Sequence, residues 1–281
     1  MRRLRSAGPT LSLLGGLLLL APVAAPAAEQ RPAPTRLETQ AIDDVLVALQ
    51  HRDCKLAAAR LNEGMARKYA GIYLMAGTMY EQGLCLKPDW DRAARMYLMA
   101  HEAGHDAGAQ RLVAGYAAPG RDPAAALWWA SKHWPQNLLP ECASAKSLVD
   151  QPEAFVEALR AWPAGRLRAC VYVLGVTAAL AGEVEYPSKG VQFSLDGELQ
   201  MSFKPAAGTI EWTPLKLEMR QMTGAMNGDA VRDRDSRWVK DSFRSYLDEV
   251  AAGVLKRYPR PEGIDPAWRV EQVYAFQLQQ E

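Results

Sequence analysis

Residues 89–104, DWDRAARMYLMAHEAG, decide the fold of the first half of this 281-residue chain. The same pattern recurs on both sides, because Asp53 precedes Asp89 by 36 positions and Asp122 follows it by 33. In each place an alanine stands four positions after the aspartate. A fixed period of this length is typical of stacked helical pairs, each too small to bury its apolar face alone. Such arrays usually bind other proteins and seldom carry out chemistry.

The repeat predicts a series of helices with glycines at their ends. Apolar residues recur at helical spacing from about Thr39, and further helices are expected at about 53–63, 66–82, 89–103, 106–118 and 122–133. Breaks are expected at Gly64, Gly83, Gly104 and Gly120. The sequence therefore predicts an α-solenoid of two to three helical pairs over residues 39–133.

This pattern resembles the Sel-one-like repeat, a relative of the tetratricopeptide repeat. Residues 76–83, AGTMYEQG, match the family's Ala-Leu-Gly-x-x-Tyr-x-x-Gly segment apart from the leucine. The segments that follow in the family are matched in order by Asp89, Ala93, Tyr97, Ala100 and Gly104. The resemblance covers roughly residues 41–133. It implies a non-enzymatic adaptor, of a kind that in bacteria is often exported and stapled by disulfides.

The N-terminus has the composition of an export signal. Arg2, Arg3 and Arg5 form a basic region, Leu11–Leu20 is apolar, and Ala25-Pro26-Ala27 is a small-x-small cleavage site. The apolar run is shorter than the roughly 20 residues that a membrane-spanning helix needs. We therefore expect a signal peptide at 1–27, a disordered lead-in at 28–38, and a periplasmic or secreted mature chain with no later membrane span. An uncleaved anchor is the alternative.

Export changes the meaning of the four cysteines, Cys54, Cys85, Cys142 and Cys170. They include no C-x-x-C pair, which argues against a structural zinc site, and an even number in an exported chain fits two disulfides. Of the three possible connectivities we prefer Cys54–Cys85 with Cys142–Cys170. Cys54 begins one predicted helix and Cys85 precedes the equivalent helix one repeat later, so both should lie at the same end of the stack. The second pair rests only on what remains.

Beyond residue 133 the pattern changes from helical spacing to alternation. Residues 134–165 are expected to be a linker with a short helix at about 152–162, and residues 166–281 a small α+β domain. The domain's expected elements, in order, are a strand at 170–176, a hairpin at 191–203, a strand pair at 209–222 broken near Pro214, a helix at about 239–257 and a strand at about 270–278. The helix's expected buried positions are Val239, Phe243, Tyr246 or Leu247, Val250 and Val254. The fold class is thus α+β.

The hairpin VQFSLDGELQMSF (residues 191–203) allows two registers. A two-residue Asp-Gly loop would place the two apolar sets on opposite faces of the sheet. A three-residue loop over 195–197 would pair Phe193 with Leu199 and Val191 with Met201. The second register produces one apolar face, so we expect it.

The C-terminal region resembles the C-terminal domain of TonB-type energy transducers. Residues 190–199, GVQFSLDGEL, are similar to the family's Gly-x-Val-x-Phe-x-x-x-Asp-Gly-x-Val, and residues 246–251, YLDEVA, to its Leu-Asp-x-x-Ala helix. YPRP at 258–261 and VYAF at 273–276 are similar to its Phe-x-Pro turn and closing strand. The resemblance covers roughly 186–279 and implies a domain that binds a short receptor segment along a sheet edge. The chain departs from the family in a longer segment before the helix, no Ser-Ser-Gly and no long Pro-rich spacer, which favours a binding module over energy transduction.

Residues 101–105, HEAGH, fit the H-E-x-x-H motif of zinc proteases. In that motif His101 and His105 would hold the metal on one helix face and Glu102 would act as general base. Arg111 stands where the longer motif needs a third ligand, and a guanidinium cannot coordinate zinc. Gly104 is also the turn glycine of the repeat, so the two histidines should flank a turn. We expect two solvent-facing histidines at a helix corner.

The remaining polar residues form no further motif for catalysis or cofactor binding. His51 and His133 are expected to be isolated, and Trp128-Trp129 to fill a core or a domain interface. The acidic pairs are expected to be helix N-terminal charges or solvated faces: Asp43-Asp44, Asp89/Asp91 and Asp233/Asp235.

The near balance of 33 basic and 32 acidic side chains, a net charge of +1, offers no electrostatic case for nucleic acid. We therefore expect an exported, non-enzymatic scaffold of the bacterial cell envelope that has no cofactor and binds a protein or peptide. The alternatives are a secreted zinc peptidase using His101, Glu102 and His105, and a TonB-like energy-transduction or peptidoglycan-binding component.

Overall fold

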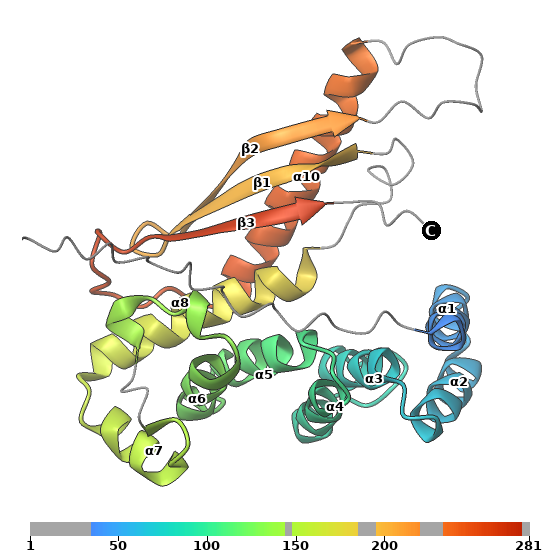
Figure 1. Cartoon of the computed structure of the whole chain (residues 1–281), viewed down its shortest axis with the longest axis horizontal. Coiled ribbons are helices and arrows are strands. Elements are labelled where there is room, and N and C mark those ends of the chain that lie inside the picture. Colours follow the sequence, from blue (N-terminus) through green and yellow to red (C-terminus); the bar gives the residue numbers. More distant parts are fainter. Residues whose placement is uncertain (1–34, 144–147, 185–194, 220–232, 277–281) are drawn as a thin grey trace, which may run out of the picture. The chain divides into compact units, whose positions relative to one another are not determined.

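The computed structural model describes residues 35–143, 148–184, 195–219 and 233–276. These residues are mostly helical and include a small three-stranded antiparallel sheet, which confirms the α+β class (Figure 1). The expected signal peptide at 1–27 lies outside the described residues.

The repeat region folds into consecutive helices, each of which packs against the next. They are α1 (Arg36–Gln50), α2 (Cys54–Ala66), α3 (Ala70–Gln82), α4 (Trp90–Glu102), α5 (Ala107–Ala117) and α6 (Pro123–His133). The expected helices from residue 53 onward are confirmed to within a few residues, but the expected break at Gly64 is wrong. α2 continues through Gly64, which is buried against Ile72 of α3 where a Cβ atom would not fit. The expected lead-in at 28–38 is wrong at its end, because α1 already begins at Arg36. Thr35 starts this helix by accepting a hydrogen bond from the N–H of Glu38.

The repeated aspartates are the N-caps of the second helix in each pair. Side-chain oxygens of Asp53, Asp89 and Asp122 accept hydrogen bonds from N–H groups in the first turns of α2, α4 and α6. Loss of such a cap typically costs about 1 kcal/mol. The alanines four positions later are fully buried: Ala57, Ala93 and Ala126. The period in the sequence therefore reflects two features that recur together: an aspartate that caps a helix and, four residues later, a buried alanine.

Close packing of α3 on α4 requires a glycine at position 77. A Cβ atom there would lie 2.4 Å from Cε1 of Tyr97, and the Tyr97 side chain is fully buried. The Tyr97 hydroxyl donates a hydrogen bond to Glu81 at 2.8 Å, which holds the ring in place. The aromatic residue of one helix thus occupies space that the glycine of its neighbour leaves open.

The segment after α6 contains η1 (Pro135–Asn137), η2 (Pro140–Cys142) and α7 (Pro152–Arg160), which confirms the short helix. α8 (Ala164–Glu183) then replaces the expected strand at 170–176, so that prediction is wrong. α8 packs against α5, α6 and α10, and residues 169, 170 and 172–180 are buried. A helix enclosed in this way is apolar on every side, and its pattern does not differ from that of a buried strand.

The sheet has the order β2-β1-β3. β1 (Leu195–Lys204) pairs antiparallel with both β2 (Thr209–Met219) and β3 (Val270–Phe276). Leu199, Met201 and Phe203 of β1 are buried, which confirms that the apolar side chains of this strand share one face.

The expected hairpin loop over 195–197 is wrong. Asp196 and Gly197 lie inside β1, where they pair with Glu218 and Leu217 of β2. The chain turns instead at 205–208, where the N–H of Gly208 bonds to the carbonyl of Lys204. Leu199 pairs with Pro214 and Tyr274, and Met201 pairs with Trp212 and Gln272. Pairing with two partner strands outweighs the local preference of Asp-Gly for a turn; residues 191–194 lie outside the described residues.

β2 is a single strand with a bulge rather than a strand pair broken at Pro214. Glu198 pairs with Lys216 while the next residue, Leu199, pairs with Pro214, so Leu215 is an extra residue in the ladder. Proline is tolerated here because β2 is an edge strand, in which one row of N–H groups needs no partner.

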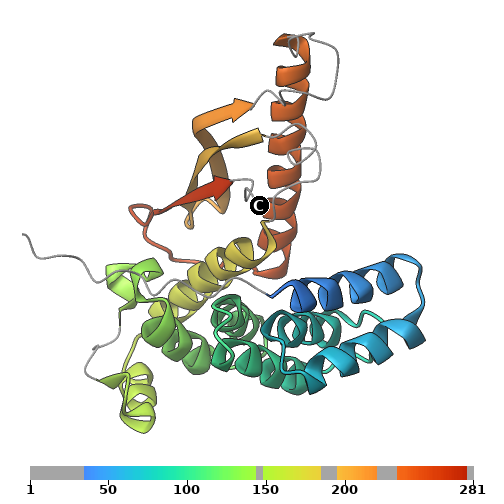
Figure 2. The same ribbon diagram turned by 45° about the vertical axis from the view of Figure 1, so that its right-hand side comes forward.

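α10 (Asp233–Arg257) packs on the buried face of the sheet, and Figure 2 shows the helix running alongside the strands. The ring of Phe243 contacts that of Phe276 in β3 at 4.8 Å between centroids. The buried residues recur at helical spacing: Phe243, Leu247, Ala251 and Val254. The expectation that Val250 is buried is wrong, because Ala251 faces the core instead and Val250 is half-buried. In β3 the expected alternation is confirmed, with Val270 and Phe276 buried. Leu278 lies outside the described residues, as does the side chain of Val239.

Both preferred disulfides are present, Cys54–Cys85 and Cys142–Cys170. The sequence predicts that no segment after the N-terminus could span a membrane. Judged by length and composition alone this prediction is wrong, because α8 is long and apolar enough to cross a membrane. Its most apolar window is 61% buried inside the protein, as is common for the core helix of a globular fold. All the described residues belong to one compact unit.

Replacing Gly77 by alanine should destabilise the chain by roughly 1–3 kcal/mol, since the added methyl group overlaps the Tyr97 ring. The matched control is Gly253→Ala in α10, where a Cβ meets nothing within 4 Å. This control should be stabilised by roughly 0.5–1 kcal/mol, the usual helix preference for alanine over glycine. Urea unfolding measures both free energies. Equal effects of the two substitutions would contradict the packing of α3 on α4.

Candidate functional site

The histidines of the HEAGH segment flank a helix corner. α4 ends at Glu102, Gly104 has a φ of 89°, and α5 begins at Ala107. The N–H of His105 donates to the carbonyl of Ala100 at 2.8 Å and closes the turn. His101 and His105 therefore do not share a helix face, as the position of Gly104 predicts. Within the described residues, no group of three or more His, Cys, Asp or Glu side chains is placed to hold a metal ion.

The corner is less exposed than expected, because His101 belongs to an aromatic cluster. Its ring centroid lies 4.3 Å from that of His133 and 5.7 Å from that of Trp129. His133 in turn stacks on Trp129 at 4.9 Å. Burial, together with the neighbouring His101 and Lys132, lowers the pKa of His133 to about 4. The expectation that His133 is isolated is wrong; the only sequence signal for this cluster is the four-residue spacing of Trp129 and His133 on α6.

The other residues that the sequence singled out have structural roles. Trp128 donates its indole N–H to the carbonyl of Val149 at 2.9 Å and so joins α6 to the segment before α7. Asp89 caps α4, and Asp44 accepts a hydrogen bond from Gln40 on the same helix. The side chains of Asp233 and Asp235 lie outside the described residues.

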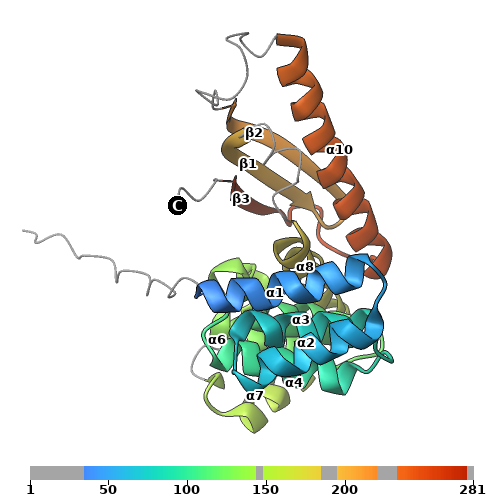
Figure 3. The ribbon, with the colours of Figure 1, turned by 90° about the vertical axis from the view of Figure 1, so that its right-hand side faces the viewer.

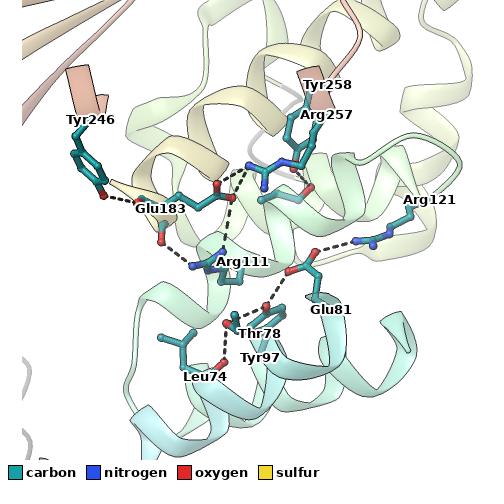
Figure 4. A network of polar contacts seen from close by, with 12 residues as sticks. Leu74, Thr78, Glu81, Tyr97, Arg111, Arg121, Glu183, Tyr246, Arg257 and Tyr258 are labelled. Carbon is teal, nitrogen blue, oxygen red and sulfur yellow. Dashed lines mark hydrogen bonds and ion pairs between the residues drawn. The ribbon is translucent and has the colours of Figure 1, made fainter. Parts of the chain in front are cut away.

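A polar network that the sequence analysis missed runs from the helical pairs to the C-terminal half (Figure 4). Its first part joins α3, α4 and the turn between α5 and α6. The Tyr97 hydroxyl and the Arg121 guanidinium both donate to Glu81, at 2.8 and 3.2 Å. Arg121 also donates to the carbonyl of Gly115, and its guanidinium carbon lies 3.9 Å from the centroid of the Trp90 ring. Glu81 is thus held by an ion pair with Arg121 and a hydrogen bond from Tyr97, and the Trp90 ring covers Arg121.

The second part of the network is centred on the C-terminal end of α8. Arg111 of α5 donates to the carbonyl of Gly182 at 2.7 Å, and Arg257 of α10 pairs with the Glu183 carboxylate at 2.6 Å. Tyr246 donates to the Glu183 carbonyl at 3.2 Å. Arg111 occupies the position where a zinc protease needs a third ligand, and it binds α8 instead. These side chains fix α5 and α10 to the same end of α8.

Tyr258 closes the network on the side of α5. Its hydroxyl donates to the carbonyl of Ala114 at 2.8 Å, and Gly175 of α8 leaves space for its ring. Burial raises the pKa of both Tyr97 and Tyr258 well above the ordinary value. Neither phenol can serve as a base near neutral pH, and both carboxylates of the network are held by arginines. The arrangement is suited to joining helices rather than to proton transfer.

Exposed apolar side chains among the described residues include some on the first helical pair and some on the sheet. On α1 and α2, which lie side by side in Figure 3, the side chains of Leu46, Val47 and Leu56 are exposed. A shallow groove of about 140 Å³ between these helices is lined by both acidic and basic side chains. On the sheet, Val273 of β3 is 57% exposed and Leu215 of β2 is 52% exposed.

No protein-family model, curated protein or solved structure matches this chain. The site must therefore be interpreted from its own geometry.

Arg111→Met should destabilise the chain by roughly 1–3 kcal/mol, because it leaves the Gly182 carbonyl without its donor in a part-buried place. The matched control is Arg257→Met at the other side of Glu183. The Arg257 side chain is 49% exposed whereas that of Arg111 is 13% exposed, so its loss should cost less than about 1 kcal/mol. Urea unfolding of both variants tests this order, and a larger loss for Arg257→Met would overturn it.

Acid should destabilise the aromatic cluster at His133. The folded pKa of about 4 lies below the unperturbed 6.5, so the unfolded chain binds the proton more readily. The stability from the neutral ring is complete above pH 6.5 and is lost as the pH falls through 4. His133→Phe keeps a ring that cannot titrate, so its free energy of unfolding should fall less between pH 7 and 4. The exposed His51→Phe serves as control, and parallel pH profiles for wild type and His133→Phe would refute the assignment.

Proposed function

We propose that this chain is an exported, non-enzymatic protein-binding scaffold of the bacterial cell envelope. Its helical pairs form a Sel-one-like solenoid. Its C-terminal half, which resembles the TonB C-terminal domain, binds an extended peptide of a partner protein along the edge of its sheet.

The observation that carries this proposal is the form of β3. This strand pairs with β1 from Val270 to Phe276 without a register shift, and no described strand pairs with its other side. An edge of this kind offers backbone N–H and C=O groups to an extended segment. Val273 provides an exposed apolar contact beside such a segment.

The opposite edge is less suitable for adding a strand. β2 carries Pro214, which lacks an N–H group, and the bulge at Leu215 interrupts its ladder. Charged side chains at Glu211 and Lys216 are also exposed there. Proline, bulges and charges are the usual means by which edge strands resist pairing. The proposed peptide site is therefore the β3 edge.

The helical half supports a second contact surface. The recurring aspartate caps and buried alanines are what a repeated helical pair requires, and stacked pairs offer extended surfaces for partner proteins. Leu46, Val47 and Leu56 leave apolar groups exposed on the first pair.

Two intramolecular disulfides indicate an oxidising environment outside the cytoplasm. The basic region, apolar run and small-x-small site at the N-terminus support export by a cleaved signal.

The proposal that the chain has no enzymatic activity is supported by the structural roles of the candidate catalytic and metal-binding residues. His101 packs against His133 and Trp129, Arg111 binds α8, and Gly104 separates His101 from His105. One zinc ion per purified chain, lost in His101→Ala, would instead support the peptidase alternative.

Site-specific photo-crosslinking in cells tests the peptide site. A photoreactive amino acid at position 273 should capture a partner protein of the cell envelope. The matched control is position 215, which is similarly exposed but lies on the bulged edge. Val273→Lys should weaken capture by a probe at 275, the next exposed position of β3, whereas Leu215→Lys should leave it unchanged. Equal capture at 273 and 215, or none at either, would refute the β3 edge as the site.

A further inference from the structure

The two disulfides differ in their access to solvent. Cys142 and Cys170 are 1% and 0% exposed and belong to the core around α8. Cys54 is exposed and Cys85 is half-buried. Exchange with a disulfide requires that an attacking thiolate reach one of its sulfur atoms. Of the two disulfides, only Cys54–Cys85 includes a residue that is exposed to solvent, which favours attack on this bond in the native fold.

The backbone at Cys85 also favours opening of this bond. Cys85 has a φ of 59°, in the left-handed region that is unfavourable for a residue with a Cβ atom. It lies in the loop between α3 and α4, where its neighbour Leu84 is 42% exposed. Breaking the bond would free Cys85 to leave this conformation. Strained and exposed disulfides are the ones that are most readily reduced.

The bond controls a part of the protein that has its own apolar cluster. Cys54 is the first residue of α2, so the disulfide ties α2 to the loop that follows α3. The buried residues of α1, α2 and α3 form a cluster separate from the core around α8, and Cys85 packs against it. The members of this cluster are Val45, Ala48, Ala57, Leu61, Ile72, Ala76 and Met79. The core that contains α8 and the sheet does not include this bond.

We propose that Cys54–Cys85 is a redox-sensitive clasp on the first helical pair, opened by an exported dithiol protein of the Cys-x-x-Cys class. The thiolate of the reductant attacks the Sγ of Cys54, which belongs to the exposed residue of the pair, and Cys85 leaves as a thiolate that takes up a proton. The second thiol of the reductant, as its thiolate, then attacks the reductant's own sulfur in the mixed disulfide, and Cys54 leaves as a thiolate that takes up a proton. The reductant ends with its own disulfide, and this chain ends with two thiols.

Opening the clasp loosens α1 and α2 while the rest of the fold persists. The bond links residues 31 positions apart, and removing a cross-link of this length raises the population of the opened form by roughly a hundredfold or more. This exposes the apolar side chains between α1, α2 and α3. The inference does not depend on the proposed peptide site at β3.

The test uses the oxidised mature chain and an excess of a Cys-x-x-Cys dithiol protein under native conditions. Free thiols are alkylated at intervals and identified by peptide mass spectrometry. Cys54 and Cys85 should be labelled at least tenfold faster than Cys142 and Cys170, which serve as the internal control. Amide hydrogen exchange over residues 36–66 should accelerate in the reduced chain, with exchange over 169–180 unchanged.

Equal labelling rates for the two pairs would overturn the proposal, as would labelling of Cys54 and Cys85 only under unfolding conditions. Cys54→Ser/Cys85→Ser provides a second measurement, since it should reproduce the fast exchange without a reductant. If this variant does not fold, the labelling rates of the unsubstituted chain still decide the question. Unchanged exchange over 36–66 after reduction would also reject the clasp.

Discussion

Enclosure of α8 on nearly every side is the constraint on which the rest of this fold depends. One side of α8 packs on α5 and α6. The Tyr172 ring of α8 contacts the Phe203 ring of β1, with 5.7 Å between the ring centroids. Gly175 of α8 leaves space for the ring of Tyr258. At the C-terminal end of α8, the backbone carbonyl of Gly182 accepts a hydrogen bond from Arg111, and the Glu183 carboxylate binds Arg257. A single helix therefore supplies apolar contacts to the last helical pair and to the sheet, and polar anchors to α5 and α10. For this reason their buried side chains form one continuous core.

The same enclosure limits what the sequence can predict. The helix pairs were predictable because their signals are local: an aspartate cap, a buried alanine four positions later and a turn glycine such as Gly104. The sequence of α8 predicts a strand, because a helix without a polar face has no helical periodicity to detect. Asp196-Gly197 predicts a turn, because its place in β1 depends on β3, which lies more than seventy positions later. Local preference decides only where no distant partner competes.

In the candidate site too, some features are predictable from the sequence and others are not. The position of Gly104 in the repeat was enough to predict that His101 and His105 flank a turn. The neighbours of His101 were not predictable, because His133 approaches it only when α4 and α6 both pack against α5. The network of Glu81, Arg121, Arg111 and Glu183 left no motif, since its members come from different helices and bind one another through long-range contacts. The positions of such charged residues along the sequence depend on which helices pack together, and not on the requirements of a chemical mechanism.

The bulge at Leu215 affects how copies of this chain can associate with one another in solution. Chains that associate through sheet edges form open-ended fibres only when each molecule offers two edges, one to receive a neighbour and one to extend the series. Pro214 and the bulge remove one of these edges. Edge-to-edge pairing of identical molecules would then stop at two, with β3 against β3. An interruption of a single residue in one strand thus sets an upper limit on aggregation through the sheet.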